Sequence, residues 1–111
     1  MEAPTGTYAA VVPVDDLRMG FTSLHEVEGR GILLARTEQG VTAWDATCPH
    51  AEFHFGPMRL QQGCILECPM HGARFDARDG HVVKGPATAG LEPIELRVKD
   101  GVVMVLVDWL L

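Results

Sequence analysis

Short segments rich in apolar and β-branched residues recur along the 111-residue chain, and turn residues separate them. These segments are residues 8–12, 24–28, 32–36, 41–45, 64–67, 94–99 and 102–107. In residues 94–99 apolar side chains alternate with charged ones, which is the period-two pattern of a half-buried strand. Asp79-Gly80 and Asp100-Gly101 favour tight hairpins because both residue types tolerate positive φ. The pattern predicts an all-β fold, an antiparallel sandwich or barrel of short strands.

Helix and linker signals are scarce. Residues 15–19 predict at most two helical turns, with Asp15 as the N-cap. No internal repeat or linker divides the chain, so we expect residues 1–111 to form one domain. The longest apolar run, residues 102–107, is too short to cross a bilayer, and no secretory signal is visible. Three cysteines is an odd number, and if two of them bind a metal no disulfide framework remains, which fits a cytoplasmic location.

The net charge is −6, from 15 acidic and 9 basic residues, with no cluster of Lys and Arg. This composition excludes nucleic acid as an expected partner, because phosphate binding needs grouped cations. An acidic surface suits docking to a basic patch on a partner protein. Solubility explains the same charge equally well.

Two loops carry most of the reactive side chains. Residues 47–57 contain Cys48 and His50 as a Cys-x-His pair, and residues 67–74 contain Cys68 and His71 as a Cys-x-x-His pair. Two thiolates and two imidazoles suit a [2Fe–2S] cluster with both cysteines on one iron and both histidines on the other. A structural zinc ion is the alternative, although zinc sites usually pair Cys with Cys and His with His.

Residues 48–86 resemble the cluster-binding part of Rieske proteins, which carry Cys-x-His, fifteen to seventeen residues, then Cys-x-x-His. The stretch Cys-Pro-Met-His-Gly-Ala-Arg-Phe-Asp, residues 68–76, is similar to the second loop of soluble Rieske ferredoxins. Residues 94–107 resemble the closing hairpin of that family. The resemblance implies a Rieske fold with a cluster-binding subdomain at about residues 46–87, and one Rieske-type cluster per chain held by Cys48, His50, Cys68 and His71.

By the same resemblance, the chain is a soluble ferredoxin and not itself an enzyme. Such proteins carry single electrons from a flavin-containing NAD(P)H-dependent reductase to a terminal oxygenase, typically an aromatic-ring dioxygenase of aromatic hydrocarbon catabolism. We expect a cytoplasmic monomer without membrane contact. Met70, Phe53 and Pro86 are expected to form a small apolar contact patch inside an acidic rim. Two alternatives stay open: a small Rieske-like subunit of an assimilatory nitrite reductase, and a zinc-stabilised binding module without a redox role.

Several positions depart from the high-potential Rieske proteins. Those proteins have a disulfide-bonded cysteine where this chain has Phe53 and Met70, and hydroxyl donors where it has Ala73 and Phe75. Fewer donors to the sulfurs stabilise the reduced cluster less. The resemblance therefore predicts a reduction potential at the low end of the Rieske range, about −150 mV.

The remaining histidines and the third cysteine are expected to have no role in the site. His54 follows the first loop's ligands and is taken as a surface residue, because the Cys-x-His match favours His50. His25 and His81 lie in strand-like segments and are taken as surface residues. Cys64 opens a predicted strand and is expected to be a buried, inert thiol. Trp44 and Trp109 are expected in the core.

Overall fold

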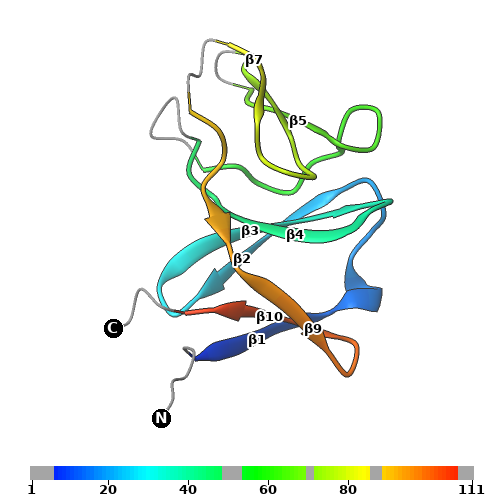
Figure 1. Cartoon of the computed structure of the whole chain (residues 1–111), viewed down its shortest axis with the longest axis vertical. Helices are drawn as coiled ribbons and strands as arrows, with labels where there is room; N and C mark the ends of the chain where they lie inside the picture. Colours follow the sequence, from blue (N-terminus) through cyan, green and yellow to red (C-terminus); the bar gives the residue numbers. More distant parts are fainter. Residues whose placement is uncertain (1–6, 49–53, 70–71, 86–88, 108–111) are drawn as a thin grey trace.

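The computed structural model describes residues 7–48, 54–69, 72–85 and 89–107, and nearly all regular structure in these parts is β-strand (Figure 1). The strands are β1 (Tyr8–Pro13), β2 (Thr22–Val27), β3 (Arg30–Thr37), β4 (Gly40–Asp45), β5 (Ile65–Glu67), β6 (Arg74–Asp76), β7 (Val82–Lys84), β8 (Pro93–Ile94), β9 (Leu96–Lys99) and β10 (Val102–Leu106). One short 3-10 helix, η1 (Val14–Asp16), follows β1. Every pairing between these strands is antiparallel. The predicted all-β antiparallel fold is confirmed.

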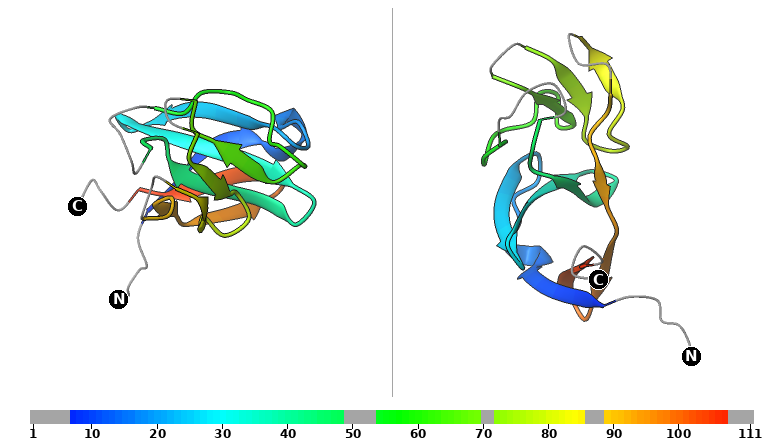
Figure 2. Two further views of the ribbon diagram at one scale, coloured as in Figure 1. Left: turned by 90° about the horizontal axis from the view of Figure 1, so that it is seen from above. Right: turned by 90° about the vertical axis from the view of Figure 1, so that its left-hand side faces the viewer.

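The strands form three sheets, with the orders β1-β10-β9, β2-β3-β4-β8 and β5-β6-β7. The β5-β6-β7 sheet lies at one end of the molecule and the β1-β10-β9 sheet at the other (Figure 1). The four-stranded sheet lies between them, as the right-hand view in Figure 2 shows.

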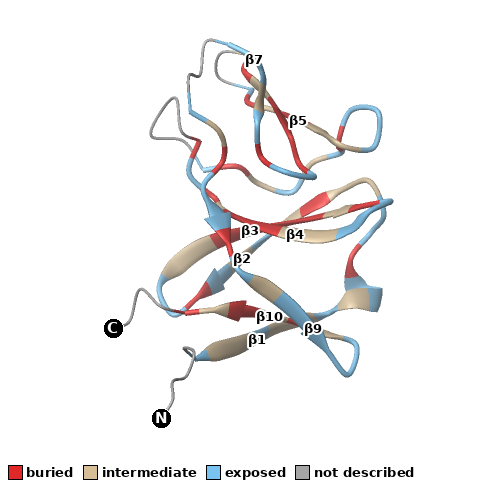
Figure 3. Ribbon diagram, viewed as in Figure 1, coloured by how far each residue is buried: buried red, intermediate tan, exposed pale blue. Residues whose placement is uncertain are grey.

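The middle sheet separates two cores, because β3 is buried on both faces (Figure 3). Ile32 and Leu34 point into a lower core, while Leu33 and Ala35 point into an upper core, as strand alternation requires. The lower core consists of Leu17, Val27, Ile32, Leu34, Ala43, Ile94, Val103, Val105 and Val107. The upper core consists of Leu33, Ala35, Trp44, Ala46, Cys48, Phe55, Leu60, Leu66, Cys68, Ala73, Phe75, Ala77 and Leu91. The predicted core position of Trp44 is confirmed, and Trp109 lies outside the described residues.

The single strand predicted over residues 94–99 is wrong, because the chain changes sheets at Glu95. Strand β8 pairs with β4 in the middle sheet, whereas β9 pairs with β10. The Glu95 carbonyl accepts a hydrogen bond from the Leu106 amide at this change of sheet. Ile94 is buried but Val98 is 50% exposed, so the predicted apolar face does not continue along β9.

Two hairpin turns follow directly from the sequence. The β9–β10 turn is Asp100-Gly101, with φ of 53° and 78°, and the β2–β3 turn is Glu28-Gly29, with φ of 50° and 83°. Two-residue turns with positive φ at both positions match the right-handed twist of the strands. The prediction made for Asp100-Gly101 is confirmed.

The predicted helix at residues 15–19 is shorter and begins earlier. Helix η1 covers three residues, its N-cap is Pro13, and Asp15 therefore does not cap it. The segment is held instead by Arg36, whose Nη1 donates to the carbonyls of Val14 (3.1 Å) and Leu17 (2.8 Å). Among the described residues, no helix has the length and apolar character needed to cross a membrane.

Strands β6 and β7 were not among the segments predicted from periodicity. Each has only three residues, which is too short to show an alternating pattern. The Asp79-Gly80 signal lies in the turn between them, but this turn has five residues, 77–81, and of the pair only Gly80 has positive φ, so the predicted tight turn is wrong here.

Candidate metal centre

The first cysteine follows β4 in a loop whose two ends are tied together. The Ala46 carbonyl accepts the Phe55 amide at 2.7 Å, and Thr47 forms a β-bridge with His54. The Asp45 carboxylate accepts the Thr47 amide at 2.8 Å and so fixes the turn into the loop. Cys48 comes directly after this tie and is 2% exposed.

The second cysteine follows β5 in a tighter loop. The Cys68 amide donates to the Ala73 carbonyl at 2.8 Å, and the Gly72 amide donates back to the Cys68 carbonyl at 2.9 Å. Gly72 has φ of +76°, a conformation that favours glycine. These two hydrogen bonds bring the described ends of the loop together, and the loop begins at a fully buried cysteine.

Both cysteines belong to the upper core. None of the chain's three cysteines, all within the described ranges, is in a disulfide. Two buried thiols in closed loops, carried on one rigid scaffold, fit the thiolate half of a [2Fe–2S] site with mixed ligands. His50 and His71 lie outside the described residues, two and three positions after their cysteines in the same two loops.

The described residues that share the upper core with the two cysteines are apolar. The Phe55 and Phe75 rings pack edge to face, with centroids 6.2 Å apart, and Ala73 and Leu66 are fully buried. This packing excludes water from the protein side of the two loops. Ala73 and Phe75 offer no side-chain hydrogen-bond donor, which favours a low reduction potential.

A polar network lies at the mouth of the second loop. Glu67 accepts hydrogen bonds at Oε1 from Gln61 Nε2 (2.8 Å) and from Arg74 Nε (2.9 Å). The Gln61 amide, followed by the Arg74 guanidinium, holds the pKa of Glu67 below its ordinary value. Sequence reasoning missed this network, because nothing local links residue 61 to residues 67 and 74.

The β6–β7 turn rests on the middle sheet through close contacts. Thr42 Oγ1 donates to the Ala77 carbonyl at 2.7 Å and accepts the Trp44 indole N–H at 3.0 Å. Gly80 lies against the Trp44 ring so closely that a Cβ on it would come within 2.7 Å of a ring carbon. These contacts fix the sheet that carries Cys68 relative to β4, which leads to Cys48.

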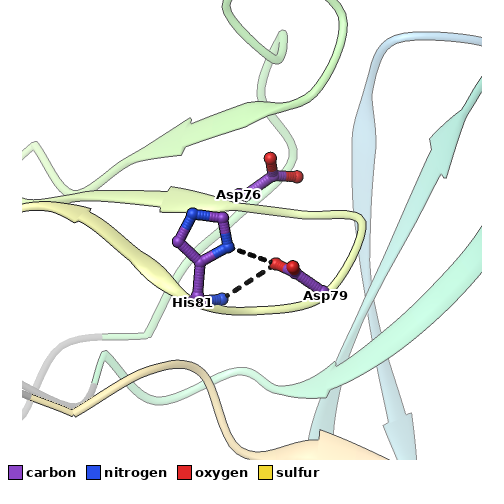
Figure 4. Close-up of side chains that lie close together, drawn as sticks. All are labelled: Asp76, Asp79 and His81. Carbon is purple, nitrogen blue, oxygen red and sulfur yellow. Dashed lines mark hydrogen bonds and ion pairs between the residues drawn. The ribbon is translucent and has the colours of Figure 1, made fainter.

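Asp76 at the end of β6, and Asp79 and His81 in the turn after it, have side-chain atoms that could ligate a metal ion. These atoms lie within 4.8 Å of one another (Figure 4). Each carboxylate is already engaged. Asp76 binds Arg78 through Nε at 2.9 Å and Nη2 at 2.6 Å, and Asp79 binds His81 Nδ1 at 2.6 Å. Both aspartates also accept the backbone amide two residues on, as aspartates commonly do in turns. We therefore interpret the group as turn structure.

The other reactive residues only partly follow expectation. His54 is exposed, as a surface residue should be. His25 is half-buried on β2, where its Nε2 lies 2.8 Å from Ser23 Oγ and burial lowers its pKa, so it is not a plain surface residue. His81 is exposed but lies in a turn rather than a strand.

The third cysteine, Cys64, is only partly buried, so the expectation of a buried thiol is wrong. It precedes β5, where its carbonyl accepts a hydrogen bond from the Ala77 amide at 2.7 Å.

Comparison with known proteins gives a consistent result. The family model of the Rieske [2Fe–2S] domain matches residues 7–98. The ferredoxin component of an alkene monooxygenase system from Xanthobacter autotrophicus is 30% identical over 98 residues, which cover 88% of this chain and 80% of the relative. The ferredoxin component of the naphthalene 1,2-dioxygenase system of Pseudomonas putida is 27% identical, covering 91% and 96%. A solved complex of reduced oxygenase and oxidised ferredoxin in carbazole 1,9a-dioxygenase contains a chain that matches with a TM-score of 0.78 at 26% identity, covering 92% and 94%.

Proposed function

The chain belongs to the Rieske [2Fe–2S] domain family, and from this we propose that it is a ferredoxin that carries single electrons to a terminal oxygenase. The observation that carries the proposal is the pair of buried cysteines, Cys48 and Cys68, each at the start of a closed loop. The match to ferredoxin components of oxygenase systems covers most of both chains and supports the same role.

The cofactor is a Rieske-type [2Fe–2S] cluster, which supplies reversible one-electron chemistry when bound. We propose that Cys48 and Cys68 ligate one iron and that His50 and His71 ligate the other. The protein's own contribution is to hold the two loops at a fixed separation and to keep the sulfur side dry. We further propose that residues 46–87, built around the β5-β6-β7 sheet, form the cluster-binding subdomain.

The partners follow from the relatives. The ferredoxin of the carbazole 1,9a-dioxygenase system is solved in complex with its oxygenase, which supports direct docking of this chain to a terminal oxygenase. The named systems include both aromatic-ring dioxygenases and an alkene monooxygenase, so we propose an oxygenase of either type as acceptor and a flavin-containing NAD(P)H-dependent reductase as donor. We propose a cytoplasmic monomer, because thiols kept out of disulfides suit a reducing compartment.

Neither alternative gains support from an observation of its own. A solved small subunit of a nitrite reductase shares the fold at 19% identity, and this likeness speaks to the fold alone. The family match to a [2Fe–2S] domain disfavours a zinc-stabilised module.

Ligand assignment is tested by single substitutions in protein made with ample iron. We expect C48S, H50A, C68S and H71A each to abolish the visible absorption of the cluster. C64S and H54A are the matched controls and should retain it, with about two irons per chain. Retention of a normal cluster in any of the first four variants, or its loss in H54A with retention in H50A, would overturn the assignment.

A further inference from the structure

The mouth of the second ligand loop is held by backbone hydrogen bonds between Cys68 and residues 72 and 73, and by the side chains of the short strand pair before it. Strands β5 and β6 pair over only three positions, and the last pair before the loop is Glu67 opposite Arg74. The loop between them, residues 68–73, contains both proposed ligands of this side. Any device that holds the two strand ends together therefore acts directly on the separation of Cys68 and His71 from the first loop.

The inner and outer sides of this mouth are held differently. On the inner side, Leu66 and Phe75 form the neighbouring cross-strand pair and are fully buried. On the outer side, the Arg74 Nε donates to Glu67 Oε1, with the two side chains 42% and 33% exposed. Apolar packing holds the buried face and the hydrogen bond between Cys68 and Ala73 holds the backbone, so the ion pair adds the side-chain contact that holds the exposed face.

A third residue steadies the pair from outside the hairpin. Gln61 donates its side-chain amide to the same Glu67 oxygen at 2.8 Å. Its own backbone is fixed to β5, because it exchanges two 2.8 Å hydrogen bonds with Ile65. Glu67 is thus held from two directions and has little rotational freedom left to lose.

We propose that Glu67, clamped by Arg74 and Gln61, is a positioning residue that fixes the loop of Cys68 and His71 and so slows release of the cluster. This proposal rests on the proposed function. Ion pairs at this level of exposure contribute little to global stability, so the clamp should act on the loop and not on the fold. That separation gives the proposal a distinctive signature.

The test follows cluster release from purified holoprotein in excess iron chelator, by the decay of visible absorbance. We expect release about five-fold faster in E67Q and in R74Q than in the unaltered chain, with thermal unfolding of the protein fold nearly unchanged. R74K should lie between R74Q and the unaltered chain, because an ammonium keeps the charge but loses the planar guanidinium geometry. D79N removes a carboxylate at the opposite end of the same sheet and should release the cluster at the unaltered rate.

The charge swap E67R/R74E decides between a clamp and a mere change of charge. It restores an ion pair at the loop mouth, and the Gln61 amide can accept from an arginine at position 67 as well as donate to a glutamate. We expect the swapped protein to release its cluster within about two-fold of the unaltered rate. Its reduced EPR signal should be as narrow as that of the unaltered chain, while E67Q and R74Q give broadened lines.

Unchanged release in both single variants would overturn the proposal, as would a swapped protein that releases as fast as the singles. Faster release accompanied by an equal fall in thermal stability would also overturn it, because that would be a general structural effect. Failure of the proposed function would look different, since the unaltered chain would then contain no [2Fe–2S] cluster to release.

Discussion

At the residue scale, the metal site combines two buried cysteines with Ala73 and Phe75, two described residues of the same core whose side chains have no hydrogen-bond donor. Ala73 stands where the high-potential family members place a serine hydroxyl, and its side chain is fully buried in the upper core. The position therefore offers a direct way to alter the potential without altering a ligand.

We expect A73S to raise the reduction potential. A hydroxyl donated towards the cluster sulfurs stabilises the more negative reduced state, and a differential of about 1 kcal/mol corresponds to about 40 mV for one electron. Protein-film voltammetry measures the change. A73G is the control for altered packing without a donor, and an equal rise in both variants would contradict the hydrogen-bond explanation.

A second residue-scale prediction concerns Asp76, whose side chain is 7% exposed and accepts two hydrogen bonds from the Arg78 guanidinium. The Arg78 side chain is the main cause that holds the Asp76 pKa below its ordinary 3.8. A group whose pKa falls on folding stabilises the native state above its unfolded pKa and loses that contribution as pH drops through the folded one. D76N should therefore unfold at lower urea than the unaltered chain at pH 7, with the gap closing as the pH falls below 3.8. A gap that stayed constant down to pH 2 would show that the charge of Asp76 is not involved.

At the element scale, the contact between the β6–β7 turn and the middle sheet depends on Gly80. Its φ is +84°, and an added Cβ would lie 2.7 Å and 2.8 Å from two Trp44 ring carbons. The turn also bonds to the following segment, because the Gly80 carbonyl accepts the Leu91 amide at 2.8 Å. A displaced turn would thus shift the sheet that leads to Cys68.

We expect G80A to lower the free energy of unfolding by about 2 kcal/mol, from backbone strain and the clash with Trp44 together. G101A is the matched control, since Gly101 has φ of +78° with nothing within 4 Å of the added Cβ. It should cost about 1 kcal/mol, from the backbone alone. Urea titrations of both variants give the comparison, and equal losses would remove Trp44 from the explanation.

The sequence was most informative where local chemistry decides the structure. Asp100-Gly101 turns as expected because positive φ is a property of the two residues themselves. The two cysteine loops could likewise be located from their spacing. The change of sheet at Glu95 could not, because it depends on which distant strand pairs with each half of the segment. The Glu67 network was invisible for the same reason, since its geometry arises only after β5 and β6 pair.

At the scale of the whole molecule, two separate hydrophobic cores hold the three sheets together. The lower core joins the β1-β10-β9 sheet to one face of the middle sheet, and the upper core joins the β5-β6-β7 sheet to the other face. Only the upper core contains the two buried cysteines. Its outer sheet has strands of three residues each, whereas β3 in the middle sheet has eight.

Removal of the cluster should therefore loosen one end of the molecule selectively. In chelator-treated protein we expect amides of β5 and β6 to lose hydrogen-exchange protection, because short strands with little packing open first. Amides of β3 and β10 should keep most of theirs. Loss of protection in all four strands together would show that the two cores unfold as one unit.

The central claim, a one-electron carrier with mixed cysteine and histidine ligation, is tested most directly by a reductive titration of the purified protein followed by low-temperature EPR. We predict uptake of one electron per two irons, near −150 mV, and a rhombic signal with an average g below about 2. A colourless protein that contains zinc when made with ample iron would contradict the claim. A potential near −400 mV would contradict the histidine ligands, because that value is typical of clusters held by cysteines alone.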